Sequence, residues 1–115
     1  MSKAGVRRRS ECPLACTLDL IGDKWTLLVI RDLLCGKHSF NAFAQSPERI
    51  ATNILTNRLE RLMDHGLVAR KPIKEHAGRY RYELTERGMS LTPILESLAT
   101  WGLENIAGTV QRMQP

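Results

Sequence analysis

The clearest hydrophobic pattern in the chain lies within residues 48–71. Leu55, Leu59 and Leu62 recur four and then three positions apart, so a helix, which turns about 100° per residue, would stack them into one apolar stripe. Gly66 is well placed to end this helix, because glycine is favoured just past a helix C-terminus. We expect a helix that packs this stripe on the core and leaves its other face exposed.

The exposed face of this helix is predicted to have two halves. Glu60 and Asp64 lie towards its C-terminal end, where phosphates of DNA would repel both carboxylates. The N-terminal half carries hydroxyls and amides suited to base edges, flanked by cations. The candidate DNA contacts are Thr52, Asn53, Thr56, Asn57, Arg58 and Arg61. The alternative is an ordinary amphipathic surface helix.

A first, shorter helix is predicted from Pro13 to Gly22, since proline is favoured in the first turn of a helix. Its apolar residues fall on two nearly opposite faces. One face carries Leu14, Leu18 and Ile21, and the other carries Cys12, Cys16 and Leu20. A helix that is apolar on two sides needs two surfaces to pack against. We expect the Leu14 face to lie on the core and the Leu20 face to contact a partner subunit.

Two more helices are expected before residue 48. Asp23 is a suitable N-cap for a core helix that stops at Gly36, and Ser39 is a suitable N-cap for a very short helix at residues 40–44. The apolar stripe of the core helix is formed by Trp25, Leu28, Val29 and Leu33. A Gln-Ser-Pro-Glu turn follows the short helix. Short helix, turn and longer polar-faced helix, in that order, are typical of a helix-turn-helix.

Two short strands are predicted at residues 67–73 and 79–84, separated by a turn. Between Leu67 and Tyr82 the chain has five lysines and arginines but one glutamate, so this hairpin holds most of the net charge of +5. A hairpin this basic after a polar-faced helix indicates a wing that contacts phosphates. The candidate contacts are Lys74, Arg79 and Arg81. The alternative is a solvated strand edge whose charges protect it against aggregation.

A final helical region is predicted from Thr85, with apolar residues at helical spacing. Pro93 should either kink it or mark its true first turn. A terminal helix this apolar covers either its own core or a partner, and the two-faced first helix favours a partner. The candidate residues of the dimer interface are Leu20, Leu95, Leu98 and Trp101.

Length and charge set the domain organisation. A chain of 115 residues is one domain with a modest core. We expect a flexible basic arm at 1–11, a winged helix-turn-helix DNA-binding domain with dimerisation helices at 12–108 and a frayed tail at 109–115. The predicted fold class is mainly α with a small antiparallel β wing. The sequence pI near 9.5 is compatible with a nucleic-acid partner but does not require one.

Composition also limits the chemistry. No apolar run approaches the roughly 20 residues that cross a bilayer, and no signal-peptide pattern follows the basic N-terminus, so we expect a cytoplasmic protein without a membrane partner. Three cysteines without a secretory context are expected to be reduced thiols. The histidines are scattered, so we expect no metal and no cofactor. An enzyme such as a thiol peroxidase is disfavoured, because no thioredoxin-like pattern surrounds a cysteine.

Motifs spread over residues 12–108 resemble the HxlR family of bacterial winged helix-turn-helix transcription regulators. They are CP at 12–13, LDLIGDKW at 18–25, LTNRL at 55–59, GLV at 66–68, YELT at 82–85 with Gly88, and WG at 101–102. The resemblance implies a homodimer whose first and terminal helices form the interface. It also implies two recognition helices that contact half-sites of a palindromic operator, about 34 Å apart.

Two features depart from the family pattern. Ala51 stands where the family often has a serine or threonine cap, so Thr52 is expected to take over the cap one residue late. The turn at residues 45–49 lacks the Pro-Gly that the family commonly carries before the recognition helix. The start of that helix therefore decides which residues face DNA.

Cys12 precedes Pro13 at a predicted helix N-terminus, where the helix dipole favours a thiolate, and Arg7, Arg8 and Arg9 are near in sequence. Several HxlR-type regulators look like oxidant or electrophile sensors that use the matching cysteine, which makes Cys12 the redox-sensing candidate. The alternative is a small apolar residue packed under the interface. Cys16 is a candidate resolving thiol, although an intersubunit bond from Cys12 meets disulfide geometry more easily.

These features favour a homodimeric, sequence-specific transcription regulator that binds double-stranded DNA and responds to an oxidant or electrophile through Cys12. The alternative is a winged-helix protein-interaction module without sequence-specific DNA binding. The missing cap at Ala51 is the one feature that motivates this alternative.

Overall fold

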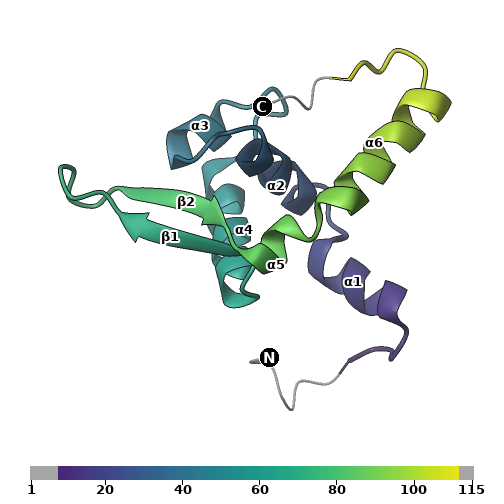
Figure 1. The fold of residues 1–115 in the computed structure, drawn as a ribbon, viewed down its shortest axis with the longest axis horizontal. Helices are drawn as coiled ribbons and strands as arrows, with labels where there is room; N and C mark the ends of the chain where they lie inside the picture. The colour runs from purple at the N-terminus through teal and green to yellow at the C-terminus, as the bar shows by residue number, and fades with distance from the viewer. Residues whose placement is uncertain (1–7, 112–115) are drawn as a thin grey trace.

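The computed structural model describes residues 8–111. In chain order the elements are α1 (Pro13–Ile21), α2 (Thr26–Leu34), α3 (Phe40–Ala44), α4 (Thr52–Asp64), β1 (Val68–Pro72), β2 (Tyr80–Leu84), α5 (Glu86–Met89) and α6 (Thr92–Asn105). The two strands form a hairpin that extends from one side of the helical body, while α1 and α6 extend from the other side (Figure 1). The predicted fold class is confirmed.

The core lies where α2, α3 and α4 meet. Leu55, Leu59 and Leu62 of α4 are all buried in it, as their spacing predicts. From α2, Val29 and Leu33 are buried as well. The other large side chains with almost no exposure are Ile30 and Phe43. Burying each leucine contributes about 1.5–3 kcal/mol, so α4 cannot turn about its axis without losing this packing. The core therefore determines which face of α4 points outwards.

The ends of α3 and α4 agree with the sequence prediction. Ser39 Oγ accepts a hydrogen bond of 3.1 Å from the Ala42 N–H and caps α3. Gly66 has a φ of +72°, a left-handed conformation that glycine adopts easily. The Leu67 N–H donates to the Leu62 carbonyl across it at 2.9 Å, which ends α4 in a Schellman motif.

The start of α2 differs slightly from the prediction. Trp25, not Asp23, occupies the N-cap position of this helix. The Asp23 carboxylate still accepts hydrogen bonds from the N–H groups of Trp25 and Thr26, at 3.0 and 3.2 Å. Asp23 therefore caps α2 from two residues further upstream than the usual position.

The hairpin is antiparallel, with Val68 opposite Leu84 and Pro72 opposite Tyr80. Strand β1 is one residue shorter than predicted at each end, and β2 is one residue shorter at its start. The Tyr82 N–H donates to the His38 carbonyl at 2.8 Å, so the loop between α2 and α3 covers part of the outer edge of β2. This contact and the buried Val68 and Tyr82 fix the base of the hairpin on the helical body.

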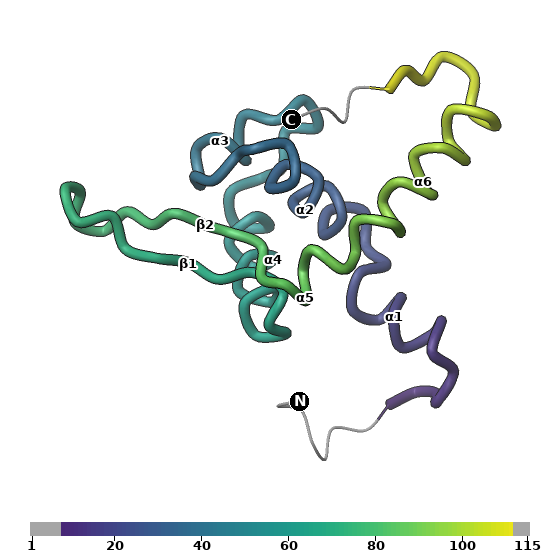
Figure 2. Tube along the Cα trace, viewed as in Figure 1, coloured from purple at the N-terminus to yellow at the C-terminus, as the bar shows by residue number. Residues whose placement is uncertain are grey.

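The two faces of α1 agree with the prediction only at Ile21. Leu14 and Leu18 are 66% and 50% exposed, whereas Leu20 packs against the core and Ile21 is buried. The helix meets the body at its C-terminal end (Figure 2), which is why Ile21 is buried while Leu14 and Leu18 stay exposed. The prediction that Leu14 and Leu18 lie on the core is therefore wrong, and Leu20, predicted to face a partner, packs partly against its own core.

The C-terminal region is divided into two helices, and Pro93 lies in the first turn of α6. Leu95 is 5% exposed and belongs to the core, so it is not available to a partner as predicted. Leu98 and Trp101 are 55% and 61% exposed, because α6 leaves the body after its first turns (Figure 1).

The expected arm at residues 1–11 and tail at 109–115 fall partly outside the described residues, which begin at residue 8 and end at residue 111. Residues 8–11 and 109–111 have no helix or strand. Within residues 8–111, no helix is long and apolar enough to cross a membrane.

Candidate nucleic-acid interface

The N-terminal half of α4 presents polar side chains to solvent. Thr52, Asn53, Thr56 and Asn57 are all exposed, as predicted for residues that face DNA. The predicted capping role of Thr52 is wrong: Ala51 occupies the N-cap position and no side chain caps the helix. Thr56 Oγ1 instead donates to the Thr52 carbonyl at 2.9 Å. The uncapped first turn leaves backbone N–H donors at a helix N-terminus, a favourable site for a phosphate.

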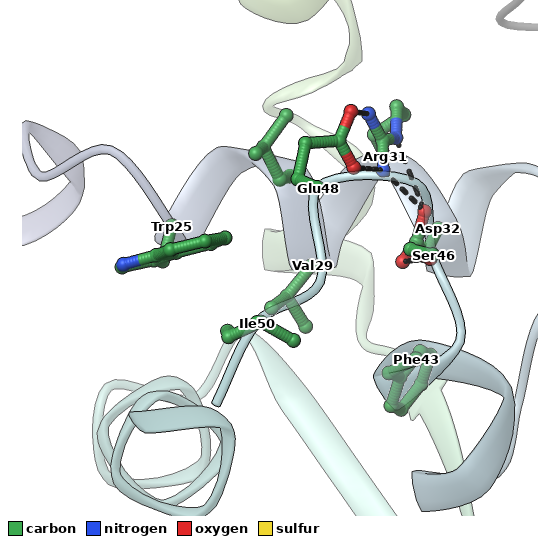
Figure 3. Close-up of a pocket in the computed structure, with 9 residues that line it drawn as sticks. Trp25, Val29, Arg31, Asp32, Phe43, Ser46, Glu48 and Ile50 are labelled. Atoms are coloured by element: carbon green, nitrogen blue, oxygen red, sulfur yellow. Dashed lines mark hydrogen bonds and ion pairs between the residues drawn. The ribbon is translucent and has the colours of Figure 1, made fainter. Parts of the chain in front are cut away.

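The turn before α4 is tied to α2 by charged groups (Figure 3). Arg31 of α2 donates two hydrogen bonds of 2.8 Å to the two carboxylate oxygens of Glu48. These bonds hold the pKa of the Glu48 carboxyl below its usual range. Below them, Ser46 Oγ donates to the buried Asp32 at 2.5 Å and accepts from Lys37 Nζ at 2.7 Å. The turn is therefore held at both ends, which sets where α4 begins.

Arg58 and Arg61, predicted to contact DNA, are engaged within the protein. Arg58 Nε lies 2.7 Å from Asp23 Oδ2. Arg61 Nη2 lies 3.3 Å from the carbonyl oxygens of both Asp19 and Leu20. Both arginines therefore join the recognition helix to the end of α1 and the start of α2. The sequence pattern missed this role because the partners of Arg58 and Arg61 lie far away along the chain.

Asp23 is the centre of this junction. Its partial burial alone would raise the pKa of its carboxyl group. Hydrogen bonds from Thr26, Arg58 and the Trp25 N–H outweigh that effect, together with the positive charge of Arg58, and hold the pKa well below the usual range of an aspartate. Asp23 is thus a carboxylate at neutral pH, paired with the recognition helix.

The basic residues of the hairpin are arranged in three groups. Lys71 and Arg81 lie opposite each other across the strands, and both pair with Glu83, at 3.3 and 3.0 Å. Arg70 stacks its guanidinium over the Tyr80 ring, 4.0 Å from the ring centre. The side chains of Lys74 and Arg79, at the tip, are exposed and make no ion pair with any residue between 8 and 111. The tip therefore carries the cations that are most available to a phosphate.

An open groove of about 570 Å³ separates the hairpin from α3 and α4. It brings Thr56 of the recognition helix and Arg79 of the hairpin to one surface, although they are far apart in sequence. Three polar lining residues were not among the predicted contacts: Ser39, Asn41 and Arg70. Arg70 contributed to the charge count of the hairpin. Ser39 and Asn41 could not be predicted as groove residues from the sequence, because only the packing of α3 beside α4 places them here.

Cys12 is exposed at the N-terminus of α1. Of the arginines that precede it, Arg9 pairs with Asp19 at 2.6 Å and Arg7 lies outside the described residues. Cys16 is partly buried, and its thiol lies 3.3 Å from the Ser10 carbonyl. All three cysteines are free thiols, and no group of potential metal ligands is present within residues 8–111.

Comparison with known proteins agrees with this arrangement. The HxlR-like helix-turn-helix family model matches residues 20–109. YdeP of Bacillus subtilis, described as an HTH-type transcriptional regulator, is 35% identical over 91 residues, which are 79% of this chain and 71% of YdeP. YybR of the same organism, described in the same way, is 35% identical over 97 residues, covering 84% of this chain and 78% of YybR.

Among solved structures, the redox regulator HypR in its oxidised form superposes with a TM-score of 0.75 and 35% identity, over 82% of this chain and 97% of HypR. Its reduced form superposes with a TM-score of 0.76 and 33% identity, over 84% of this chain and 95% of HypR. The polar-faced α4, the hairpin and the family match lead to one conclusion: the chain belongs to the HxlR-like helix-turn-helix family of transcriptional regulators.

Proposed function

We propose that this protein is a sequence-specific DNA-binding regulator and not an enzyme. It is located in the cytoplasm and binds double-stranded DNA with α4 in the major groove. The observation that carries the proposal is the groove in which Thr56 of α4 faces Arg70 and Arg79 of the hairpin. With α4 against base edges, the hairpin would lie along the neighbouring phosphates. Hydroxyls and amides on the helix, with cations on the wing, are the division expected between base and backbone contacts.

The charge distribution supports the same orientation. Glu60 and Asp64 occupy the exposed C-terminal half of α4, so a DNA duplex lies more favourably over the N-terminal half. The uncapped helix N-terminus supplies backbone donors there, and the wing supplies the cations of Lys74 and Arg79, which make no ion pair within residues 8–111. Arg58 and Arg61 hold α4 against the rest of the protein, so we assign them a positioning role and not a direct contact with DNA.

We propose that the protein acts as a homodimer through α1 and α6. Both helices extend from the side of the body away from the hairpin (Figure 1), and Leu14 and Leu18 of α1 and Leu98 and Trp101 of α6 are exposed large apolar side chains. Large exposed apolar side chains gathered on two helices are typical of a protein–protein interface. A two-fold dimer would present two α4 helices to a palindromic operator about one DNA turn apart, roughly 34 Å.

Sedimentation would test the dimer directly. Trp101→Glu should lower the sedimentation coefficient to that of a monomer and weaken binding to a two-half-site duplex. Glu86→Gln, an exposed change on α5 outside the proposed interface, is the control and should leave both unchanged. A dimer that persists in Trp101→Glu at micromolar concentration would remove α6 from the interface.

We further propose that Cys12 responds to oxidants or electrophiles. The support is its exposure at a helix N-terminus and the similarity to HypR, which is described as a redox regulator. With hydrogen peroxide, two Cys12 thiols from two subunits would form a disulfide and release two protons and two electrons, which reduce the peroxide to two waters. Cys12→Ser should abolish any effect of peroxide on DNA affinity. A response that persists in this variant would exclude Cys12 from the mechanism.

A gel shift with the DNA upstream of the protein's own gene tests DNA binding. We expect a shifted complex that resists excess unrelated duplex and weakens as salt rises. No complex at low salt, with or without reductant, would contradict the proposal. Salt-insensitive binding to a protein partner in its place would support the alternative of a winged-helix protein-interaction module.

A further inference from the structure

Asp23 joins two helices through one carboxylate. Its Oδ2 atom accepts from the Trp25 and Thr26 N–H groups at the start of α2 and from Arg58 Nε of α4, at 3.0, 3.2 and 2.7 Å. Its Oδ1 atom accepts from the Thr26 hydroxyl and lies 3.9 Å from Arg61 Nη1. Arg58 therefore approaches a carboxylate that is already fixed by backbone donors. Its guanidinium has one preferred position.

A second nitrogen of the Arg58 guanidinium contacts Asn57. Arg58 Nη1 donates to Asn57 Oδ1 at 2.6 Å. An arginine has only donors, so the Asn57 atom that faces it must be the carbonyl oxygen of the amide and not its NH₂ group. Asn57 is exposed beside Asn53 and Thr56 on the face proposed to meet DNA. The NH₂ group of Asn57 is therefore the part of the amide turned away from Arg58.

We propose that Asp23, through Arg58, positions the Asn57 amide so that its NH₂ donors face the DNA and select a base that presents acceptors. Thymine O4 and guanine N7 and O6 are such acceptors in the major groove. Adenine N7 is such an acceptor too, and the Asn57 oxygen, which has two lone pairs, can still accept from adenine N6 beside Arg58. Cytosine is disfavoured, since its major-groove edge presents only the N4 donor, which the Asn57 NH₂ group cannot pair with. This inference rests on the proposed DNA-binding function.

The hydrogen bonds that Arg58 donates to Asp23 and to Asn57, together called the relay, form in the protein without DNA. The relay can therefore be tested on the free protein. By ¹⁵N NMR on the free protein, the Arg58 Nε–H should exchange with water at least about 10-fold more slowly than the Arg79 Nε–H, because paired donors are protected. In Asp23→Asn that protection should fall. An Arg58 Nε–H that exchanges as fast as that of Arg79 in the unmodified protein would overturn the relay.

Base preference gives the second test. All single-base changes in one half-site would be scored by fluorescence anisotropy, first with the unmodified protein and then with Asn57→Ala to find the position that Asn57 contacts. We expect guanine, thymine or adenine there, with a loss of about 10-fold or more on change to cytosine. A preference for cytosine at that position would overturn the inference.

Arg58→Lys separates positioning from charge. Lysine keeps the positive charge but cannot bridge Asp23 and Asn57 with a planar fork. It leaves the Asp23 cap on α2 in place, so it stays informative even if Asp23→Asn fails to fold. We expect the preference at the Asn57 position to fall below about 3-fold while the salt dependence of binding stays unchanged. An unchanged preference, or an equal loss on every duplex, would overturn the relay.

Failure of the proposed function would look different. An unmodified protein with no base preference at any position would contradict sequence-specific binding, and with it the base-selecting part of this inference. The exchange measurement on free protein would still decide whether Asp23 and Arg58 form the relay.

Discussion

Arg31 on α2 and Glu48 in the turn before α4 form a two-point ion pair, with both hydrogen bonds at 2.8 Å. We predict that Glu48→Gln lowers the free energy of unfolding by about 1 kcal/mol, because charge-assisted bonds contribute 1.5–3 kcal/mol when buried and this carboxylate is partly exposed. Glu60→Gln, an exposed change on α4, is the control and should have almost no effect. Urea denaturation at one fixed protein concentration checks both. Equal stabilities would show that the ion pair does not hold the turn.

Arg49 in the same turn has a φ of +58°, in the left-handed region that costs a residue with a Cβ roughly 1–2 kcal/mol. We predict that Arg49→Gly raises the free energy of unfolding by up to about 1 kcal/mol, since relief of this strain exceeds the added entropy of the unfolded chain. Gln45→Gly is the matched control, because Gln45 has a φ of −92° and has no strain to relieve. Thermal denaturation should move the two variants in opposite directions. Destabilisation by both would refute the strain.

Gly88 packs against the Leu67 carbonyl, and a Cβ atom on Gly88 would collide with that oxygen. We predict that Gly88→Ala lowers the free energy of unfolding by about 2 kcal/mol, as expected for overpacking against backbone, although alanine is the better helix former. Gly102→Ala in α6 is the control, because a Cβ there meets nothing within 4 Å. It should stabilise the protein by up to about 1 kcal/mol in chemical denaturation. A neutral or stabilising Gly88→Ala would contradict the close contact.

The Asp23 carboxylate should make stability depend on pH in acid. Its pKa is depressed in the folded state, despite partial burial, by the hydrogen bonds of Thr26 and Arg58. The stabilisation is therefore complete above the unfolded pKa of about 3.9 and is lost as the pH falls below it towards the folded pKa. We predict that the unfolding free energy of Asp23→Asn is lower at pH 7 and declines less between about pH 4 and pH 2. Parallel acid profiles for the two proteins would contradict this role.

The elements and the outward face of α4 were predictable because their signals are local. The period of Leu55, Leu59 and Leu62 identifies the buried face of α4, and Gly66 marks its end, whatever surrounds the helix. The same holds for the basic hairpin, whose charges are close in sequence.

The pairing of side chains across elements was not predictable in this way. The role of Arg58 depends on Asp23, which the fold alone brings within 2.7 Å. Likewise, the stripe of α6 contains both Leu95 and Leu98, and only the angle at which α6 leaves the body makes one a core residue and the other a surface residue. Helical spacing carries no information about that angle.

The central claim is that α4 selects base sequence while the wing supplies sequence-independent affinity. The most direct test is fluorescence anisotropy of Asn57→Ala and Arg79→Ala on the operator and on a scrambled duplex, over a range of salt. We predict that Asn57→Ala loses affinity for the operator alone, whereas Arg79→Ala weakens both duplexes and lowers the salt slope by roughly one unit. Equal losses from both substitutions on both duplexes would contradict the claim.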